Sequence, residues 1–254
     1  MNAAVFHKVE ENKENEIMKK TTPEDLIAHG VHLGHKAFKV HPRSKQYIYQ
    51  IESGTSIIDL FQTADLLEQA KQAAFELGKN GKVLLVVATK KQTKEIVGQL
   101  CAENNISYLT NKWVGGFLTN FGAISQNIKK MNTLSIEKEN GDWSQFVKHE
   151  RTGLEKKLNR ISEIYKGVAS ITKTPDALFL VDIKKENNAV LESRMEHLPT
   201  IAMVDTNTNP DLVDYPIPAN DDAISSVTFI VNEIIGAYVE GRGKVAAPAP
   251  AAAA

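Results

Sequence analysis

Three short runs of apolar residues constrain the fold of this 254-residue chain more than any other feature of its sequence. They read VLLVVA (83–88), DALFLVD (176–182) and TIAMVD (200–205). Each run is continuous rather than alternating, which is typical of strands that are buried on both faces. Such strands form parallel sheets whose two faces are covered by helices. The segment ISYLT (106–110) predicts one more strand, so the sequence indicates an α/β fold.

The hydrophobic pattern and the capping residues between these runs predict the covering helices. TTPEDLIAHG (21–30) offers Thr22 as an N-cap, followed by a proline in the first helical position. Residues 63–81 have an amphipathic pattern with an inner stripe of leucine and alanine. Residues 221–241 predict a last helix that is capped near Asp221.

Two further segments predict antiparallel hairpins. Residues 47–51 and 55–59 surround a Ser-Gly turn and predict a β-hairpin. Residues 121–171 are far more than a crossover between two parallel strands requires, and their apolar residues recur at steps of three and four. This pattern predicts an inserted, antiparallel coiled-coil helical hairpin with ENGDW (139–143) as its turn. Its expected inner positions are Ile124, Ile128, Met131, Ser135, Leu154, Leu158, Ile161, Tyr165 and Val168.

The two ends of the chain have compositions that do not predict a packed core. Residues 1–17 are polar and charged, and we interpret them as a disordered or non-native extension with Met18 as the initiator. Residues 243–254 predict a disordered Ala/Pro-rich tail. We therefore expect a single α/β domain over 18–242, with the helical hairpin inserted at about 121–171. Because no apolar run is long enough to span a bilayer and no signal peptide is apparent, we expect a soluble, cytoplasmic protein.

The charged residues are distributed unevenly along the chain, although the formal net charge is only −1. Residues 32–45 are purely basic, whereas acidic residues gather at 10–16 and through 205–222. This asymmetry predicts one face for a polyanion and a different face for other partners. Further lysine pairs stand at Lys90–Lys91, Lys129–Lys130 and Lys156–Lys157.

The basic segment HLGHKAFKVHPRSK (32–45) fits a metal site, a catalytic cluster or an arm that lies on a polyanion. The single cysteine, Cys101, excludes a multi-cysteine zinc site, and the neighbouring lysines repel a metal cation. Basic residues interleaved with Phe38 and with bends favour a phosphate backbone. We therefore expect no metal here, and we interpret Cys101 as a core residue.

Two aspartates, Asp182 and Asp205, follow predicted strands at the place where open α/β sheets usually bind ligands. They could hold Mg²⁺ for phosphoryl chemistry, or Asp205 and Asn207 could begin an Asx-type turn that caps the loop. No nucleophile or general base accompanies these acids, so the turn is favoured. The basic segment ATKKQ (88–92) follows the first strand without a glycine-rich loop, so no nucleotide-binding fingerprint is present.

The segment NKWVGGFLTN (111–120) combines basic, aromatic and amide side chains with two adjacent glycines. Gly115 and Gly116 permit a close approach or a positive φ. Lys112 and Asn120 can reach phosphate or sugar, whereas a tryptophan such as Trp113 is more often a core anchor than a stacking platform.

Several motifs together resemble the bacterial small-subunit ribosomal protein two family. They are HLGHKAFKVHPRSKQYIY, IIDL, ATKKQ, NKWVGGFLTN, PDALFLVD and VDTNTNPDLVDYPIPANDDAISSV, in that order over about residues 21–242. Departures are visible, since LGHKAFKVHPRSK stands where the family usually has FGHQTRRWNPKM, and KWVGGFLTN where it has RWLGGMLTN. Lysine in place of arginine keeps the charge but loses the bidentate geometry toward phosphate.

The resemblance implies a Rossmann-like or flavodoxin-like domain that binds small-subunit ribosomal RNA and is structural rather than catalytic. It also implies contact with neighbouring small-subunit proteins, including ribosomal protein one, in the cytoplasmic ribosome, without a cofactor, a membrane or a homo-oligomer. The alternative is an Mg²⁺-dependent phosphotransfer or nucleotide enzyme that uses Asp182 and Asp205. We expect the rRNA to be contacted by His35, Lys36, Lys39, Arg43, Lys45, Lys90, Lys91, Lys112, Trp113, Asn120, Lys129 and Lys130.

Overall fold

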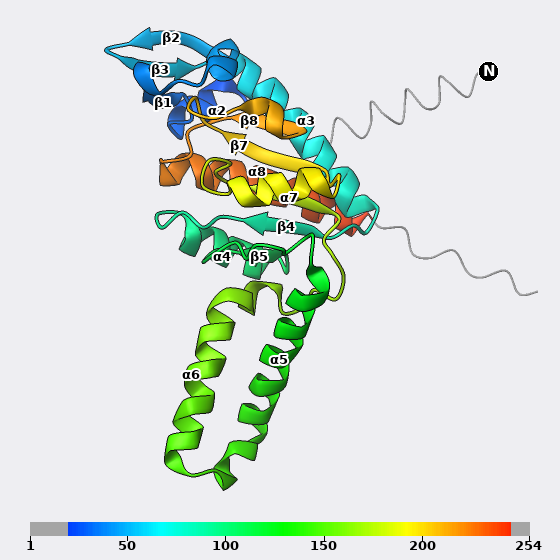
Figure 1. Cartoon of the computed structure of the whole chain (residues 1–254). Helices are drawn as coiled ribbons and strands as arrows, with labels where there is room; N and C mark the ends of the chain where they lie inside the picture. Colours follow the sequence, from blue (N-terminus) through cyan, green and yellow to red (C-terminus); the bar gives the residue numbers. More distant parts are fainter. Residues whose placement is uncertain (1–19, 245–254) are drawn as a thin grey trace, which may run out of the picture.

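The computed structural model describes residues 20–244 as an α/β fold around a five-stranded parallel sheet (Figure 1). Apart from residues 243 and 244, the predicted tails and Met18 lie outside the described residues. The three apolar runs form strands as predicted, and ISYLT forms another. The strands are β4 (Leu84–Val87), β5 (Ser107–Leu109), β6 (Ala177–Leu180), β7 (Thr200–Val204) and β8 (Tyr215–Pro218).

The strand order is β5-β4-β6-β7-β8, and every neighbouring pair is parallel. Numbered along the chain, this is the order 2-1-3-4-5 of flavodoxin-like doubly wound sheets. The chain winds away from β4 in both directions, so the order reverses between β4 and β6. In sheets of this kind, ligands bind at the carboxyl ends of the strands on either side of that reversal.

Both faces of the sheet are buried, because alternate residues of each strand pack into different cores. Val86 and Phe179 pack into a core with residues of α3, α4 and α8. Leu85 and Leu178 pack into a second core that contains residues of α5, α6 and α7. These helices are α3 (Leu60–Lys79), α4 (Lys94–Glu103), α5 (Phe121–Asn140), α6 (Lys148–Tyr165), α7 (Asn187–Met195) and α8 (Ile224–Gly243).

The helix caps follow the sequence signals with two corrections. Helix α2 (Pro23–Ala28) begins as predicted, because Thr22 forms a capping box at its start. Helix α3 begins earlier than predicted, because Asp59 caps it and accepts hydrogen bonds from the first backbone amides. Near the start of α8, Asn220 rather than Asp221 accepts from two backbone amides. Within residues 20–244, no helix combines the length and apolar composition needed to cross a membrane.

The core position of Cys101 on α4 is confirmed. Its side chain is fully buried, and burial raises the pKa of the thiol to about 12. A thiol with such a pKa stays protonated at neutral pH and is a poor nucleophile.

The sequence pattern missed strand β8 and helix α7. Strand β8 reads YPIP, and prolines are poor predictors of a strand because they lack a backbone donor. Its place at the edge of the sheet, beside β7 alone, makes the two prolines compatible with pairing on one side.

A small antiparallel sheet contains the predicted β-hairpin and one more strand. It consists of β1 (Leu33–Lys36), β2 (Ile48–Glu52) and β3 (Thr55–Ile58) in the order β1-β3-β2. Ser53 and Gly54 both have positive φ in the turn, as two-residue hairpins prefer. The basic segment is therefore not a plain loop. It forms β1 and two 3-10 turns, η1 (Ala37–Lys39) and η2 (Pro42–Tyr47).

The inserted segment forms two helices, α5 and α6, that lie side by side and project away from the sheet (Figure 1). Four residues of α5 are buried, and they include Leu134 rather than the predicted Ser135. Helix α5 ends at Gly141, whose left-handed φ of 79° begins the turn. A 3-10 turn, η3 (Asp142–Gln145), follows and buries Trp143. A second 3-10 turn, η4 (Lys166–Val168), ends the segment.

Candidate functional site

Side chains from distant parts of the chain meet at the carboxyl ends of β4, β6 and β7. Lys90 follows β4, Asp182 follows β6, and Asp205 follows β7. The carboxyl ends of parallel strands lie at one edge of the sheet, and the gap between β4 and β6 is where the strand order reverses. Asp221 and Asp222 reach the same place from the loop before α8. This group of residues, with His35, is the switch-point cluster.

Lys90 lies at the centre of the switch-point cluster and is mostly buried, with 13% of its side chain exposed. Its Nζ donates to Asp221 Oδ1 at 2.7 Å and to the Asp221 carbonyl oxygen at 2.9 Å. The same atom is 2.6 Å from Asp222 Oδ1 and 3.6 Å from Asp182 Oδ2. Burial by itself would lower the pKa of Lys90, but the hydrogen bonds to Asp221 and Asp222 raise it above its ordinary value. Lys90 therefore stays charged.

The switch-point cluster contains more carboxylates than cations. Burial raises the pKa of Asp221 to about 7, and the carboxylates of Asp182 and Asp205 add to this effect. Lys90 opposes the shift, but one ammonium group is shared by three carboxylates. Asp222 is 59% exposed, and its hydrogen bond to Lys90 lowers its pKa. Burial and the neighbouring acids therefore bring the pKa of Asp221 close to neutral pH.

His35 of β1 connects the small sheet to this cluster. Its Nδ1 is 3.0 Å from Asp205 Oδ2, and its Nε2 is 2.8 Å from Asn207 Nδ2 and 3.7 Å from Asp222 Oδ2. The hydrogen bond to Asp205 raises the pKa of His35 above its ordinary value, against the opposing effect of burial. The imidazole is thus held in place by its contacts, with 18% of the side chain exposed.

Asp182 and Asp205 also accept hydrogen bonds within the loops that follow their strands. Asp182 Oδ1 accepts from the backbone amides of Lys184 and Lys185. Asp205 Oδ1 accepts from Thr206, so its predicted structural use is confirmed. The Asx-type turn itself starts at Asn209, whose side chain accepts from the amide two residues later, and not at Asn207. Among residues 20–244, no three His, Cys, Asp or Glu side chains are grouped so that they could hold a metal ion.

The basic segment packs against the acidic segment, a contact that their positions in the sequence do not predict. The backbone amide of His41 donates to the carbonyl of Thr206 at 2.8 Å, and that of His35 donates to Thr206 Oγ1 at 3.0 Å. Arg43 Nη1 lies 2.6 Å from Asp211 Oδ2. Backbone hydrogen bonds therefore hold the two segments together, and the exposed Arg43–Asp211 pair adds little to the stability.

The closeness of this contact depends on Gly34 in β1. A Cβ atom at this position would lie 2.7 Å from Thr206 Cγ2 and 3.1 Å from the carbonyl oxygen of Ser56. Only a glycine permits the small sheet to approach the end of β7 so closely. Through Gly34 and His35, the small sheet therefore contacts the loop after β7 and the switch-point cluster.

The structure does not gather the twelve predicted rRNA-contacting residues into one patch. Figure 1 places β1 and η1 at one end of the molecule and the projecting helices at the other. His35, Arg43 and Lys90 are engaged by carboxylates, and Trp113 is buried. The exposed members are Lys36, Lys39, Arg43, Lys45, Lys91, Lys112, Asn120, Lys129 and Lys130.

Trp113 belongs to a second organised region, which sequence reasoning missed. Glu192 of α7 is 8% exposed, and its carboxylate accepts from Trp113 Nε1 at 2.9 Å. It also accepts from the backbone amides of Gly116 at 2.9 Å and Leu118 at 3.0 Å. The signal that could have found it is an acid on the buried stripe of α7, beside Val190. Glu192 fixes the segment that presents Lys112 to solvent.

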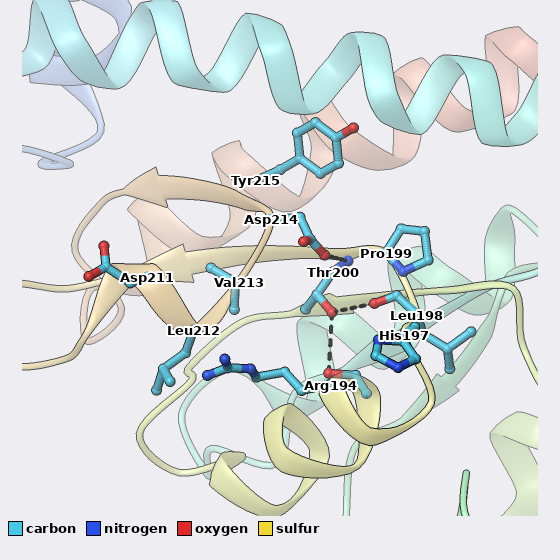
Figure 2. A pocket seen from close by; sticks show the side chains of 11 residues that line it. Arg194, His197, Leu198, Pro199, Thr200, Asp211, Leu212, Val213, Asp214 and Tyr215 are labelled. Carbon is cyan, nitrogen blue, oxygen red and sulfur yellow. Dashed lines mark hydrogen bonds between the residues drawn. The ribbon is translucent and has the colours of Figure 1, made fainter.

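Three clefts lie at the amino ends of the strands, opposite the switch-point cluster. One has a volume of about 560 Å³ beside the starts of β7 and β8 (Figure 2). The other two measure about 490 Å³, beside β7 and β8, and about 370 Å³, beside β4 and β5. In the first cleft, Thr200 bonds to Asp214, Ser193 and Leu198. The backbone amide and the hydroxyl of Thr200 are therefore satisfied by other residues of the wall.

Comparison with known proteins agrees with the motifs in the sequence. The family model described as Ribosomal protein S2 matches residues 26–241. Small ribosomal subunit protein uS2 of Chlorobium chlorochromatii is 40% identical over 219 residues, which are 86% of this chain and 87% of that protein. The proteins of the same name from Coprothermobacter proteolyticus and Flavobacterium psychrophilum are each 39% identical, over 225 and 222 residues. These matches cover 89% and 87% of this chain and 84% of each relative. The chain therefore belongs to the ribosomal protein S2 family.

Proposed function

We propose that this protein is a structural, non-catalytic component of the small ribosomal subunit, where it binds ribosomal RNA in the cytoplasm. The observation that carries the proposal is the family match over residues 26–241, together with relatives named small ribosomal subunit protein uS2. The switch-point cluster supports a structural role, because its charged groups bind one another. An Mg²⁺-dependent enzyme that uses Asp182 and Asp205 is disfavoured, since backbone amides and His35 already engage these carboxylates.

Two groups of exposed cations fit the phosphate backbone. The first is the basic turn surface, which consists of Lys36, Lys39 and Lys45 around η1 and η2. The second consists of Lys112, Lys129 and Lys130 at the start of the helical hairpin and on α5, with the neutral Asn120 exposed beside them in the sequence. Exposed lysines bind phosphates by displacing counterions, without any need for base contacts. Lys91 is a further exposed candidate.

The engaged members of the predicted set act indirectly in this proposal. His35 and Arg43 hold the basic turn surface against the loop after β7. Trp113 anchors the segment that carries Lys112. Lys90 offsets part of the negative charge of Asp182, Asp221 and Asp222. A loss of any of these would change RNA binding through a change in shape and not through a lost phosphate contact.

We also propose that α5 and α6 pack as a coiled coil and that the protein docks ribosomal protein one. The apolar residues of both helices at steps of three and four support the supercoiled packing. The exposed Lys156, Lys157 and Arg160 on α6 support a docking role for the projecting arm. The whole segment of residues 18–242 is proposed to be one domain.

Binding to small ribosomal subunits from which this chain has been removed tests the proposal. The full chain should sediment with these particles, and its affinity should fall steeply with salt. Changing Lys36, Lys39 and Lys45 together to alanine should reduce the log–log salt slope by about two to three, since each phosphate contact contributes about 0.7–0.9. An equal number of exposed lysines changed elsewhere provides the matched control, namely Lys20, Lys82 and Lys244. A wild-type chain that fails to sediment with the particles would contradict the proposed function.

A further inference from the structure

Phe38 lies between Lys36 and Lys39 of the basic turn surface in the sequence and is 80% exposed. It is the middle residue of η1, between β1 and η2. Isolated apolar residues on a surface are common and need no explanation by themselves. Phe38 differs because exposed cations stand on either side of it in the sequence, namely Lys36 and Lys39. Lys39 Nζ lies 5.9 Å from the centroid of the phenyl ring.

The backbone that carries Phe38 is fixed by hydrogen bonds on both sides. The amide of Ala37 donates to the carbonyl of Gly54 at 2.9 Å, which ties η1 to the turn of the β-hairpin. The amide of His41 donates to the carbonyl of Thr206 at 2.8 Å, which ties the chain after η1 to the loop after β7. The ring is therefore presented from a rigid base. A partner that stacks on it does not have to order the turn first.

An exposed ring among cations matches the chemistry of an unpaired nucleotide. The base supplies a π-face that stacks on the phenyl ring, and the adjoining phosphates supply negative charge for the lysines. A protein partner would instead require a continuous apolar surface around the ring, and here Lys36 and Lys39 adjoin it. A base within a duplex has no free face, so the partner would be a loop, a bulge or a strand end.

We propose that Phe38 is a stacking platform for an unpaired base of the ribosomal RNA, while Lys36 and Lys39 bind its phosphates. This inference rests on the proposed function, because it names the RNA element that the basic turn surface takes. It assigns base recognition to one side chain and charge recognition to its neighbours. The two contributions should therefore separate experimentally.

The test uses full-length variants and small ribosomal subunits from which this chain has been removed. Phe38→Leu keeps an apolar side chain and the charge but removes the π-face, so affinity should fall roughly 5- to 100-fold with the salt slope unchanged. Phe38→Trp should bind as well as the wild type or better. Phe61→Leu is the matched control, because Phe61 is 73% exposed and, among the described residues, has no cation placed over its ring.

The Phe38→Trp variant also reports the chemical nature of the partner. Trp113 and Trp143 are buried, so they provide the baseline in the wild type. The fluorescence of the introduced indole should be quenched on binding, and ultraviolet crosslinking with mass spectrometry should yield a nucleotide adduct. An adduct to a peptide would overturn the proposal in favour of a protein contact.

The outcomes distinguish this proposal from the proposed function. If the wild type binds the particles and Phe38→Leu binds equally well, stacking is refuted while the ribosomal role stands. If Phe38→Leu and Phe61→Leu lose affinity to the same extent, the effect is not specific to the ring and the proposal is also refuted. If the wild type itself does not bind, it is the proposed function that fails.

Discussion

Replacement of Lys90 by methionine should destabilise the protein far more than it affects any single RNA contact. The methionine keeps most of the apolar stem but removes the ammonium group. Asp221, Asp222 and Asp182 then lose the cation that they share. Breaking a buried ion pair by removal of one partner leaves the acids either charged without compensation or forced to bind a proton, and both are unfavourable.

The expected loss follows from the geometry around Nζ. Two hydrogen bonds go to Asp221, at 2.7 and 2.9 Å, and Asp221 is 2% exposed. A hydrogen bond to a charged group contributes about 1.5–3 kcal/mol. The contact with Asp222 adds little, because that side chain is 59% exposed and solvent screens it. We therefore expect the free energy of unfolding to fall by about 3–5 kcal/mol at pH 7.5, the range measured for broken buried pairs.

Urea denaturation followed by circular dichroism measures this loss. Lys91→Met is the matched control, since Lys91 is the exposed neighbour and its replacement should change the free energy of unfolding by less than about 0.5 kcal/mol. The loss caused by Lys90→Met should be smaller at pH 5. Without the ammonium group, the folded-state pKa values of the buried acids rise, so the folded state takes up protons and regains stability as the pH falls.

A double variant, Lys90→Met with Asp221→Asn, separates the loss of an ion pair from a general packing defect. It should recover much of the stability, because the uncompensated carboxylate is removed together with its partner. Equal stability of Lys90→Met and Lys91→Met at pH 7.5 would refute the reasoning. So would a full loss of stability in Lys90→Met that neither low pH nor Asp221→Asn reduces.

Three further predictions follow from other contacts. Glu192→Ala leaves three donors without an acceptor and should lower the free energy of unfolding by about 3–5 kcal/mol, with a shift in the fluorescence of Trp113 that a solvent-facing variant would not cause. Gly34→Ala pushes β1 away from the loop after β7 and should lower the free energy of unfolding, measured by urea denaturation, by about 1–3 kcal/mol. Gly122 on α5 has open space around it, so Gly122→Ala should instead raise the free energy of unfolding by up to about 1 kcal/mol. Equal effects of Gly34→Ala and Gly122→Ala would contradict the steric explanation. The pKa of Asp221 rises from an ordinary value of 3.8 to about 7 on folding. Between these pH values the folded state holds a proton that the unfolded state lacks. The free energy of unfolding therefore falls as the pH rises through this range. Asp221→Asn should flatten that decline in Tm between pH 4 and pH 7, and an unchanged slope would show that another group carries it.

The pattern of apolar residues was enough to predict the sheet, because a strand that is buried on both faces has a continuous apolar sequence. Continuous runs such as VLLVVA and DALFLVD became β4 and β6. Thr22 became an N-cap as predicted, since a cap acts within four residues of itself. Strand β8 was missed because its two prolines argue against a strand. Only its position at the edge of the sheet makes them compatible with strand pairing.

The sequence by itself therefore determined the fold class, the main elements and, through its motifs, the family. Only the tertiary structure decided what the charged residues do. Lys90 and Asp221 are 131 positions apart, and His35 and Asn207 are 172 apart, so no periodicity or spacing connects them. Basic residues that form one run in the sequence thus divide into those that hold the fold together, such as His35, and those that face solvent, such as Lys36 and Lys39. The physical reason is that secondary structure depends on neighbours along the chain, whereas the charge state and availability of a side chain depend on its neighbours in space.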